Sequence, residues 1–208
     1  MAILSFNKKL TVSVCFGLII AVLISVLSFA RTSERISDKV LRLHVLANSD
    51  SSFDQSMKLK VRDAVLTAGS CIFDGSLDAE NAAAKLMPEI DRLEAAADRV
   101  VKEYGSDYNV KITVGREYFT TRCYRSVTLP AGKYMSVKVS IGKGEGHNWW
   151  CVMFPPMCVP AASAEDELRN VLNDSEIKLV KSKPKYEPRF KIVELYEKLR
   201  QSLEKVKK

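Results

Sequence analysis

The sequence predicts an α+β domain that follows an N-terminal hydrophobic helix. Three observations lead to this class. Leu10 to Ala30 is a run of 21 residues without a charge. Apolar residues then recur at helical spacing through most of residues 52–104, and at every second position in segments of residues 110–141. Because the helical and strand patterns lie in separate blocks, we expect a βα unit, a kinked helical stretch, an antiparallel meander and a C-terminal helix.

The N-terminal segment is predicted to export the protein. As a helix, the uncharged run would be about 31 Å long, which is enough to cross a bilayer. Lys8 and Lys9 precede it, so the N-terminus is expected in the cytoplasm and the rest of the chain outside. The run ends in Ser28-Phe29-Ala30, which has the small residues of a signal-peptidase site. Residues 1–30 are therefore either a cleaved signal peptide or a retained membrane anchor.

The charge of the chain lies at its C-terminal end. Residues 178–208 hold eleven Lys or Arg against four Glu, which accounts for the whole formal charge of +7. We expect an exported domain over residues 31–180, followed by a linker and a basic helix over residues 181–208. The basic segment has no nucleic-acid-binding signature, so nucleic acid is not a predicted partner, whereas an anionic membrane surface is.

The first predicted unit of the domain is a strand followed by a helix. The strand covers Lys39 to Ala47, and a polar turn leads into a helix whose capping box is Ser52 with Gln55. Gly69 ends this helix. The helix has an apolar face, formed by Phe53, Met57, Val61, Ala64, Val65 and Ala68. The opposite face is polar and is formed by Asp54, Lys58 and Arg62.

The remaining elements follow from breaks in the pattern. Pro88 is expected to divide or kink a helical stretch over residues 77–104. Gly115 is expected to turn the chain between the first two strands of the meander. The predicted segments are strands over 110–114, 118–128 and 135–141, a short helix over 163–173, a linker over 181–188 and a last helix over 189–206.

Residues 142–160 hold both tryptophans of the chain, Trp149 and Trp150. Three glycines at alternate positions precede the tryptophans, and Pro155 and Pro156 follow them, so we expect a rigid loop and not a central strand. A disulfide between Cys151 and Cys158 would close this loop and contribute about 2–3 kcal/mol. In an exported domain, that pair would leave Cys71 and Cys123 to each other by elimination alone.

The sequence does not have the pattern of an enzyme. His147 precedes Cys151 by four residues, as a cysteine hydrolase could require, but an exported thiol with a nearby disulfide partner would not stay reduced. His44 and His147 lack the paired spacing of a zinc site. The glycine run precedes aromatic residues and prolines instead of a helix, so it is not a phosphate cradle. We therefore expect no catalytic residues, no metal and no cofactor.

A partner-binding surface is the alternative that the aromatic segment favours. Trp149, Trp150 and Phe154, which lie close together in a loop, cannot all bury in one direction without strain, and exposed Trp is a common interface anchor. A core plug is the other interpretation, and the pattern leaves both open. For His44, Asn48 and Asp50, turn propensities favour the ordinary roles of a strand residue, a turn former and a helix cap over partner binding. The candidate partner-binding residues are His147, Asn148, Trp149, Trp150, Phe154, Pro155, Pro156, His44, Asn48 and Asp50.

Several blocks of the chain resemble the stage II sporulation protein R family. They are Arg-Leu-His-Val-Leu-Ala-Asn-Ser-Asp at 42–50 with Asp54-Gln55 and residues 58–65, Leu-Pro-Ala-Gly at 129–132, Asn-Trp-Trp-Cys-Val at 148–152 and Phe-Pro-Pro-Met-Cys at 154–158. Arg189-Phe190-Lys191 agrees more loosely. Together these blocks span most of the exported domain, although the family pattern does not require Cys71 or Cys123.

The resemblance implies a signalling protein of endospore formation. Such a protein is made in the forespore and exported into the space between forespore and mother cell. There it activates a membrane-embedded aspartic protease of the mother cell, which cleaves the precursor of sigma factor E. The family member is the activator and not the protease. A structural or envelope-surface protein without a signalling role is the alternative function.

Overall fold

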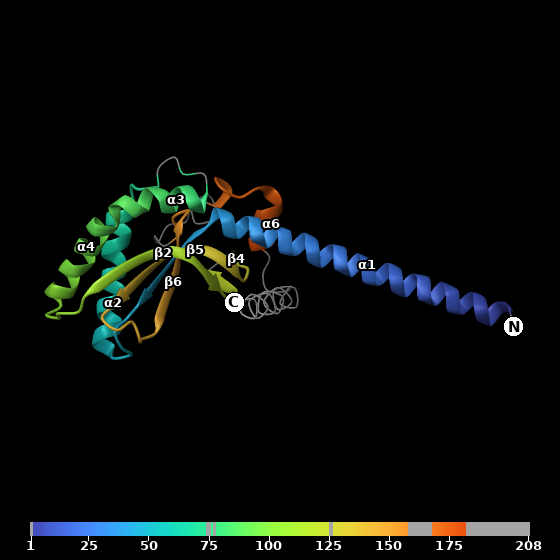
Figure 1. The fold of residues 1–208 in the computed structure, drawn as a ribbon, viewed down its shortest axis with the longest axis horizontal. Coiled ribbons are helices and arrows are strands. Elements are labelled where there is room, and N and C mark those ends of the chain that lie inside the picture. The colour runs from blue at the N-terminus through green and yellow to red at the C-terminus, as the bar shows by residue number, and fades with distance from the viewer. Residues whose placement is uncertain (1, 74–75, 77, 125–126, 158–167, 182–208) are drawn as a thin grey trace, which may run out of the picture.

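The computed structural model describes residues 2–73, 76, 78–124, 127–157 and 168–181 and has the predicted mixture of helices and sheet (Figure 1). The elements are α1 (Ala2–Lys39), β1 (Leu41–Leu46), α2 (Ser52–Gly69), α3 (Ala79–Leu86), the short 3-10 helix η1 (Met87–Glu89), α4 (Ile90–Glu103), β2 (Val110–Phe119), β3 (Arg122–Tyr124), β4 (Val127–Leu129), β5 (Gly132–Ile141), β6 (Asn148–Phe154) and α6 (Asp174–Lys181).

Helix α1 contains the predicted hydrophobic segment and continues beyond it. Residues 9–39 are long and apolar enough to cross a membrane, and Figure 1 shows this part projecting away from the rest of the chain. Ile36, at the inner end of the helix, and Val40, directly after it, are fully buried in the domain. Residues 31–39 therefore continue the helix, with Ser33, Ile36 and Ser37 buried against the domain.

The main sheet has the strand order β2-β5-β1-β6. β5 pairs antiparallel with β2 and parallel with β1, and β6 pairs antiparallel with β1. The predicted meander is wrong in its order, because β2 pairs directly with β5 and the predicted second strand does not lie between them. Gly115 does not turn the chain but pairs with Ser136 within β2. Beyond Phe119, the predicted second strand continues as a separate pair, β3 with β4.

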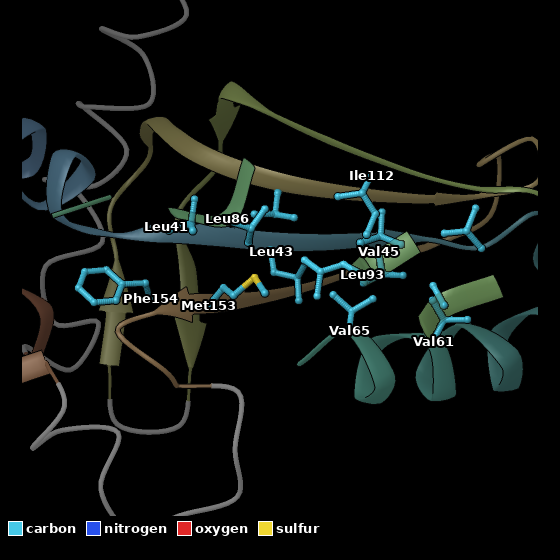
Figure 2. Packing of buried hydrophobic residues seen from close by; sticks show 14 of the residues in the cluster. Leu41, Leu43, Val45, Val61, Val65, Leu86, Leu93, Ile112, Met153 and Phe154 are labelled. Carbon is cyan, nitrogen blue, oxygen red and sulfur yellow. The ribbon is translucent and has the colours of Figure 1, made fainter. Parts of the chain in front are cut away.

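One face of the sheet packs against helices α2, α3 and α4. Figure 2 shows Leu43 and Val45 of β1 facing Val61 and Val65 of α2, with Met153 of β6 beside them. The division of the helical stretch at Pro88 is confirmed, since Pro88 lies within η1 between α3 and α4. Proline has no amide hydrogen to donate, and it is tolerated at the start of a helix.

The opposite face of the sheet is also covered. The inner end of α1, the β3–β4 pair and α6 form a second apolar cluster there with Phe119, Tyr134 and Val152. Helix α6 is not predicted by the sequence. Glu176 of α6 is fully buried, and its Oε2 lies 2.8 Å from Nζ of Lys39 in α1. Residues 163–167 of the predicted short helix, the linker beyond 181 and the helix at 189–206 lie outside the described residues.

Helix α2 begins one residue earlier than its predicted capping box indicates. Oγ of Ser51, and not of Ser52, caps the helix by accepting the Asp54 amide at 3.1 Å. The predicted faces also differ in the first turns, because Phe53 is 46% exposed whereas Asp54 and Lys58 are buried. Periodicity places Phe53 with the core, but both buried polar groups have partners at one corner of the sheet, described below.

Candidate functional site

The predicted aromatic loop is in part the strand β6. Asn148, Trp149 and Trp150 pair with Leu46, Val45 and His44 of β1. The expectation of a loop fails because Pro155 and Pro156 follow the last strand residue and form a turn, where no ladder hydrogen bond is required of them. Of the candidate residues, Asn148, Trp149, Trp150 and Phe154 therefore lie on β6, an edge strand of the sheet.

The two indole rings lie on opposite faces of the sheet, as alternation along a strand requires. Trp149 packs against the helix-face core and lies under the guanidinium of Arg62, 4.5 Å from the ring centroid. Trp150 stacks on His44 with centroids 4.8 Å apart, and Arg122 lies 5.1 Å from it on the second face. Both rings are half-buried. Each tryptophan therefore combines core packing with an accessible part.

His44 connects the tryptophan strand to the edge strand β2. Its side chain is 6% exposed, and its Nε2 lies 2.7 Å from Oε2 of Glu117. Burial lowers the pKa of His44, and the Glu117 carboxylate opposes this shift without cancelling it. The Lys138 ammonium lowers the pKa further, while hydrogen bonds with Glu117 and Asn148 raise it. The folded protein therefore favours a neutral imidazole beneath Trp150.

We expect the free energy of unfolding to fall as the solution is acidified. Because the pKa of His44 is below its ordinary value of 6.5 in the folded state, the unfolded chain binds the proton first. This contribution to stability is complete above about pH 6.5 and is lost as pH falls through the lowered pKa. Urea unfolding of the full chain in detergent at pH 7.5, 6 and 5 measures it. The fall should be smaller in His44→Gln, and an equal fall would contradict the assignment.

Arg42 is a fully buried cation on the same face. Its guanidinium carbon lies 4.1 Å from the centroid of Phe119 and 4.8 Å from that of Tyr134. Nη2 donates to the Tyr124 hydroxyl at 2.6 Å, while Nε and Nη1 have no hydrogen-bond partner in the described part of the chain. The aromatic rings offset part of the cost of burying this charge.

The packing of Arg42 predicts a difference between two substitutions. Arg42→Met keeps most of the volume among the rings and removes a buried charge, so the free energy of unfolding should change by about 1 kcal/mol or less. Arg42→Ala leaves a cavity there and should cost about 2 kcal/mol more than Arg42→Met. Urea titration of both variants tests this. A loss in Arg42→Met as large as in Arg42→Ala would show that the charge itself is required.

The start of β6 is held by the turn that joins β1 to α2. The Lys143 amide donates to Oδ1 of Asn48 at 3.0 Å, and the Gly146 amide donates to the Ala47 carbonyl at 2.9 Å. Asp50 Oδ1 accepts the His147 amide at 2.5 Å, which lowers the pKa of the Asp50 carboxyl. Asn48 thus has the turn role that the sequence allows it, whereas Asp50 is not the helix cap, which is Ser51. Both residues also position the tryptophan strand.

Two buried polar groups of α2 complete this corner. Asp54 Oδ2 accepts from Asn48 Nδ2 at 3.1 Å and from Ser49 Oγ at 2.5 Å. Burial alone would raise the pKa of Asp54, but these hydrogen bonds lower it. Lys58 Nζ donates to the His147 carbonyl at 2.8 Å, and burial lowers the pKa of Lys58. Sequence reasoning missed both residues, because their partners are in the turn and in the segment before β6.

The ten candidate residues do not form one surface. His147, whose side chain is 81% exposed, and Asn148 lie at one end of β6 with both tryptophans. Phe154 and Pro155 are buried at the other end, about 20 Å along the strand, and Pro156 is exposed there. At the first of these ends, the accessible part consists of His147, Asn148 and the open sides of both indoles. We call these four residues, 147–150, the tryptophan edge.

The cysteines differ in part from the expectation. Cys151 is 5% exposed and disulfide-bonded, while its predicted partner Cys158 lies outside the described residues, so that pairing stays a prediction. Cys71 and Cys123 are free, so their pairing by elimination is wrong. Since a buried, oxidised Cys151 offers no thiolate, the cysteine-hydrolase alternative lacks its nucleophile. Within the described residues, no three His, Cys, Asp or Glu side chains gather as metal ligands.

Comparison with known families decides the identity. The family model described as stage II sporulation protein R matches residues 37–164, which include β1, the polar corner and all of β6. The chain belongs to the stage II sporulation protein R family. This membership relates the chain to sporulation, and the family is not a known enzyme family. The long apolar helix is consistent with export or membrane anchoring.

A curated relative supports the same family. The chain is 33% identical over 123 residues to the stage II sporulation protein R of Bacillus subtilis strain 168. The matched region is 59% of this chain and 55% of the relative, so the match spans about half of the relative's length. No solved structure matches this chain.

Proposed function

We propose that this protein is an exported signalling protein of endospore formation. It activates a membrane-embedded aspartic protease of the mother cell, which then processes the precursor of sigma factor E. The protein acts in the space between forespore and mother cell. Its family, its N-terminal apolar helix and its accessible tryptophan edge support this proposal.

The observation that carries the activator role is the tryptophan edge on β6. Arg62 and His44 lie against its two rings and restrict their orientation, so little side-chain freedom remains to be lost on binding. Half-buried indoles beside exposed polar residues are typical of protein interfaces. Tighter contact of this edge with the active conformation of the protease would shift the protease population toward that conformation.

Helix α1 favours a membrane-anchored form of the activator. The helix runs without a break through Ser28-Phe29-Ala30, and Ile36 in its last turns is fully buried in the domain. The anchor and the domain are therefore joined with no flexible linker between them. The basic segment 181–208 lies outside the described residues, and an anionic membrane surface stays its predicted partner.

Co-expression in a non-sporulating bacterium tests the function. The host would produce the full chain, the candidate protease and the unprocessed sigma precursor, and cleavage would be followed by immunoblot. We expect cleavage only when all three are present. Deleting residues 10–30, which removes the export segment, should abolish cleavage although the domain is still made.

The opposite results would reject the activator role. Cleavage of equal extent with and without the chain would favour a structural or envelope-surface protein. Cleavage by the chain and precursor alone would mean that the chain is itself a protease. Full cleavage by the chain without residues 10–30 would contradict action outside the cytoplasm.

A further inference from the structure

A cavity of about 410 Å³ lies where α1 meets the domain. Leu27 and Ala30, from the end of the apolar run, form one part of its lining, and Gly132 and Lys133 at the start of β5 form another. The volume is within the range of small-ligand pockets in proteins. The cavity is thus continuous with the surface of α1 that a bilayer would contact.

The lining of this cavity contains a buried hydroxyl without a partner. Ser33 is 4% exposed, and its Oγ makes no hydrogen bond in the described part of the chain. An unpaired buried hydroxyl costs free energy unless a ligand or water supplies the hydrogen bond. By contrast, Oγ of Ser37, which also lines the cavity, donates to the Glu34 carbonyl at 2.7 Å. Because this oxygen has almost no accessible surface, Ser33 can serve a bound group only after its side chain turns toward the cavity.

The charges around the cavity favour an anion near Arg31. The lining contains Arg31, Arg116 and Lys133 against Glu34 and Asp38. Arg116 Nη1 lies 3.0 Å from Oδ1 of Asp38, and Nη2 lies 3.7 Å from Oε2 of Glu80, so Arg116 is already engaged. Arg31 is exposed and has no ion pair within the described ranges. Its guanidinium can take a phosphate in a bidentate manner.

The position of the cavity along α1 identifies the source of the phosphate. At 1.5 Å per residue, Glu34 lies about 6 Å beyond Ala30, where the apolar run ends. The headgroup layer on each side of a bilayer is about 5–7 Å thick, which is half of the difference between the total thickness of the bilayer and the thickness of its hydrocarbon core. If α1 spans the membrane, Arg31 and Ser33 are therefore at headgroup depth, and Leu27 is at the depth of the acyl chains.

We infer that this cavity binds one glycerophospholipid, with the phosphate on Arg31 and Ser33 and the acyl chains along α1 beside Leu27. This inference rests on the anchored form of the proposed activator. A lipid held at the junction would fix the angle between the anchor and the domain. The tryptophan edge would then be presented at a defined orientation above the membrane.

Native mass spectrometry of the full chain in detergent tests the inference. The probes are phosphatidylglycerol and diacylglycerol with identical acyl chains, so that the phosphoglycerol headgroup is the sole difference. We expect one phosphatidylglycerol to be retained per chain, and diacylglycerol at least fivefold less. Arg31→Gln should reduce retention of phosphatidylglycerol at least fivefold, and Ser33→Ala should reduce it about threefold.

Arg35→Gln is the matched control, because Arg35 is one helical turn further along α1 and does not line the cavity. It should retain phosphatidylglycerol as the parent does. Equal retention of both lipids, or equal losses in Arg31→Gln and Arg35→Gln, would overturn the inference. The intact mass in the same spectrum tests the anchored form separately from lipid binding. If the protein purified from membranes begins at Arg31, the N-terminal segment has been cleaved and the anchored form is overturned.

Discussion

Trp149→Ala is expected to lower precursor cleavage in the co-expression assay at least tenfold while the domain stays folded. An indole at the centre of an interface commonly contributes about 2 kcal/mol or more to binding, which corresponds to more than a tenfold change in affinity. Trp149 is half-buried on an edge strand, so its removal should cost the fold less than the loss of a core residue. Immunoblots measure cleavage, and urea unfolding of the purified variant measures stability.

Two further variants separate contact from folding. Met87→Ala removes a side chain that is 60% exposed on η1, away from the tryptophan edge, and should leave cleavage unchanged. Trp150→Ala removes the ring stacked on His44, so it should destabilise the fold by about 2–3 kcal/mol as well as reduce cleavage. Full cleavage by a folded Trp149→Ala chain would mean that Trp149 is not part of the contact.

Gly146→Ala is expected to lower the free energy of unfolding by about 2–4 kcal/mol. A Cβ on Gly146 would overlap the carbonyl of Ser49, whose backbone cannot move aside as a flexible side chain would. The loop would have to shift, and the hydrogen bond from the Gly146 amide to the Ala47 carbonyl would be lost with it. Overpacking of about 1–3 kcal/mol and the lost bond of about 1 kcal/mol give this magnitude.

Gly115→Ala is the matched control for this prediction. A Cβ on Gly115 would meet no atom within 4 Å, and the position lies within β2. We expect its unfolding midpoint in urea to stay at or slightly above that of the parent. Gly146→Ala as stable as Gly115→Ala would contradict the close docking of the loop on the β1–α2 turn.

Local sequence signals predict much of this fold. The apolar helix, the helix ended by Gly69 and the break at Pro88 all arise from spacing or from a residue that restricts its own backbone. The strand order is not predictable in this way. Parallel pairing of Leu43 with Val137 joins segments that are distant in the sequence, and no turn residue signals it.

The candidate site is predictable to a similar extent. Composition alone identifies Trp149 and Trp150, because two adjacent indoles followed by prolines are uncommon. The contacts that position these rings come from distant segments, namely Arg62 on α2 and His44 on β1. Alternation suggests that Arg42 and His44 face solvent on one side of β1, yet the β3–β4 pair, α1 and α6 cover that face.

Photo-crosslinking tests most directly whether the tryptophan edge contacts the protease. A benzophenone amino acid would replace Asn148, which is exposed beside Trp149, or Met87 as the comparison site. Both chains would be irradiated in cells that contain the protease and the sigma precursor. We predict a covalent product with the protease from position 148 and none from position 87, with cleavage retained before irradiation. Two results would contradict contact through the tryptophan edge. One is retained cleavage with no crosslinked product from position 148, and the other is retained cleavage with equal amounts of crosslinked product from both positions.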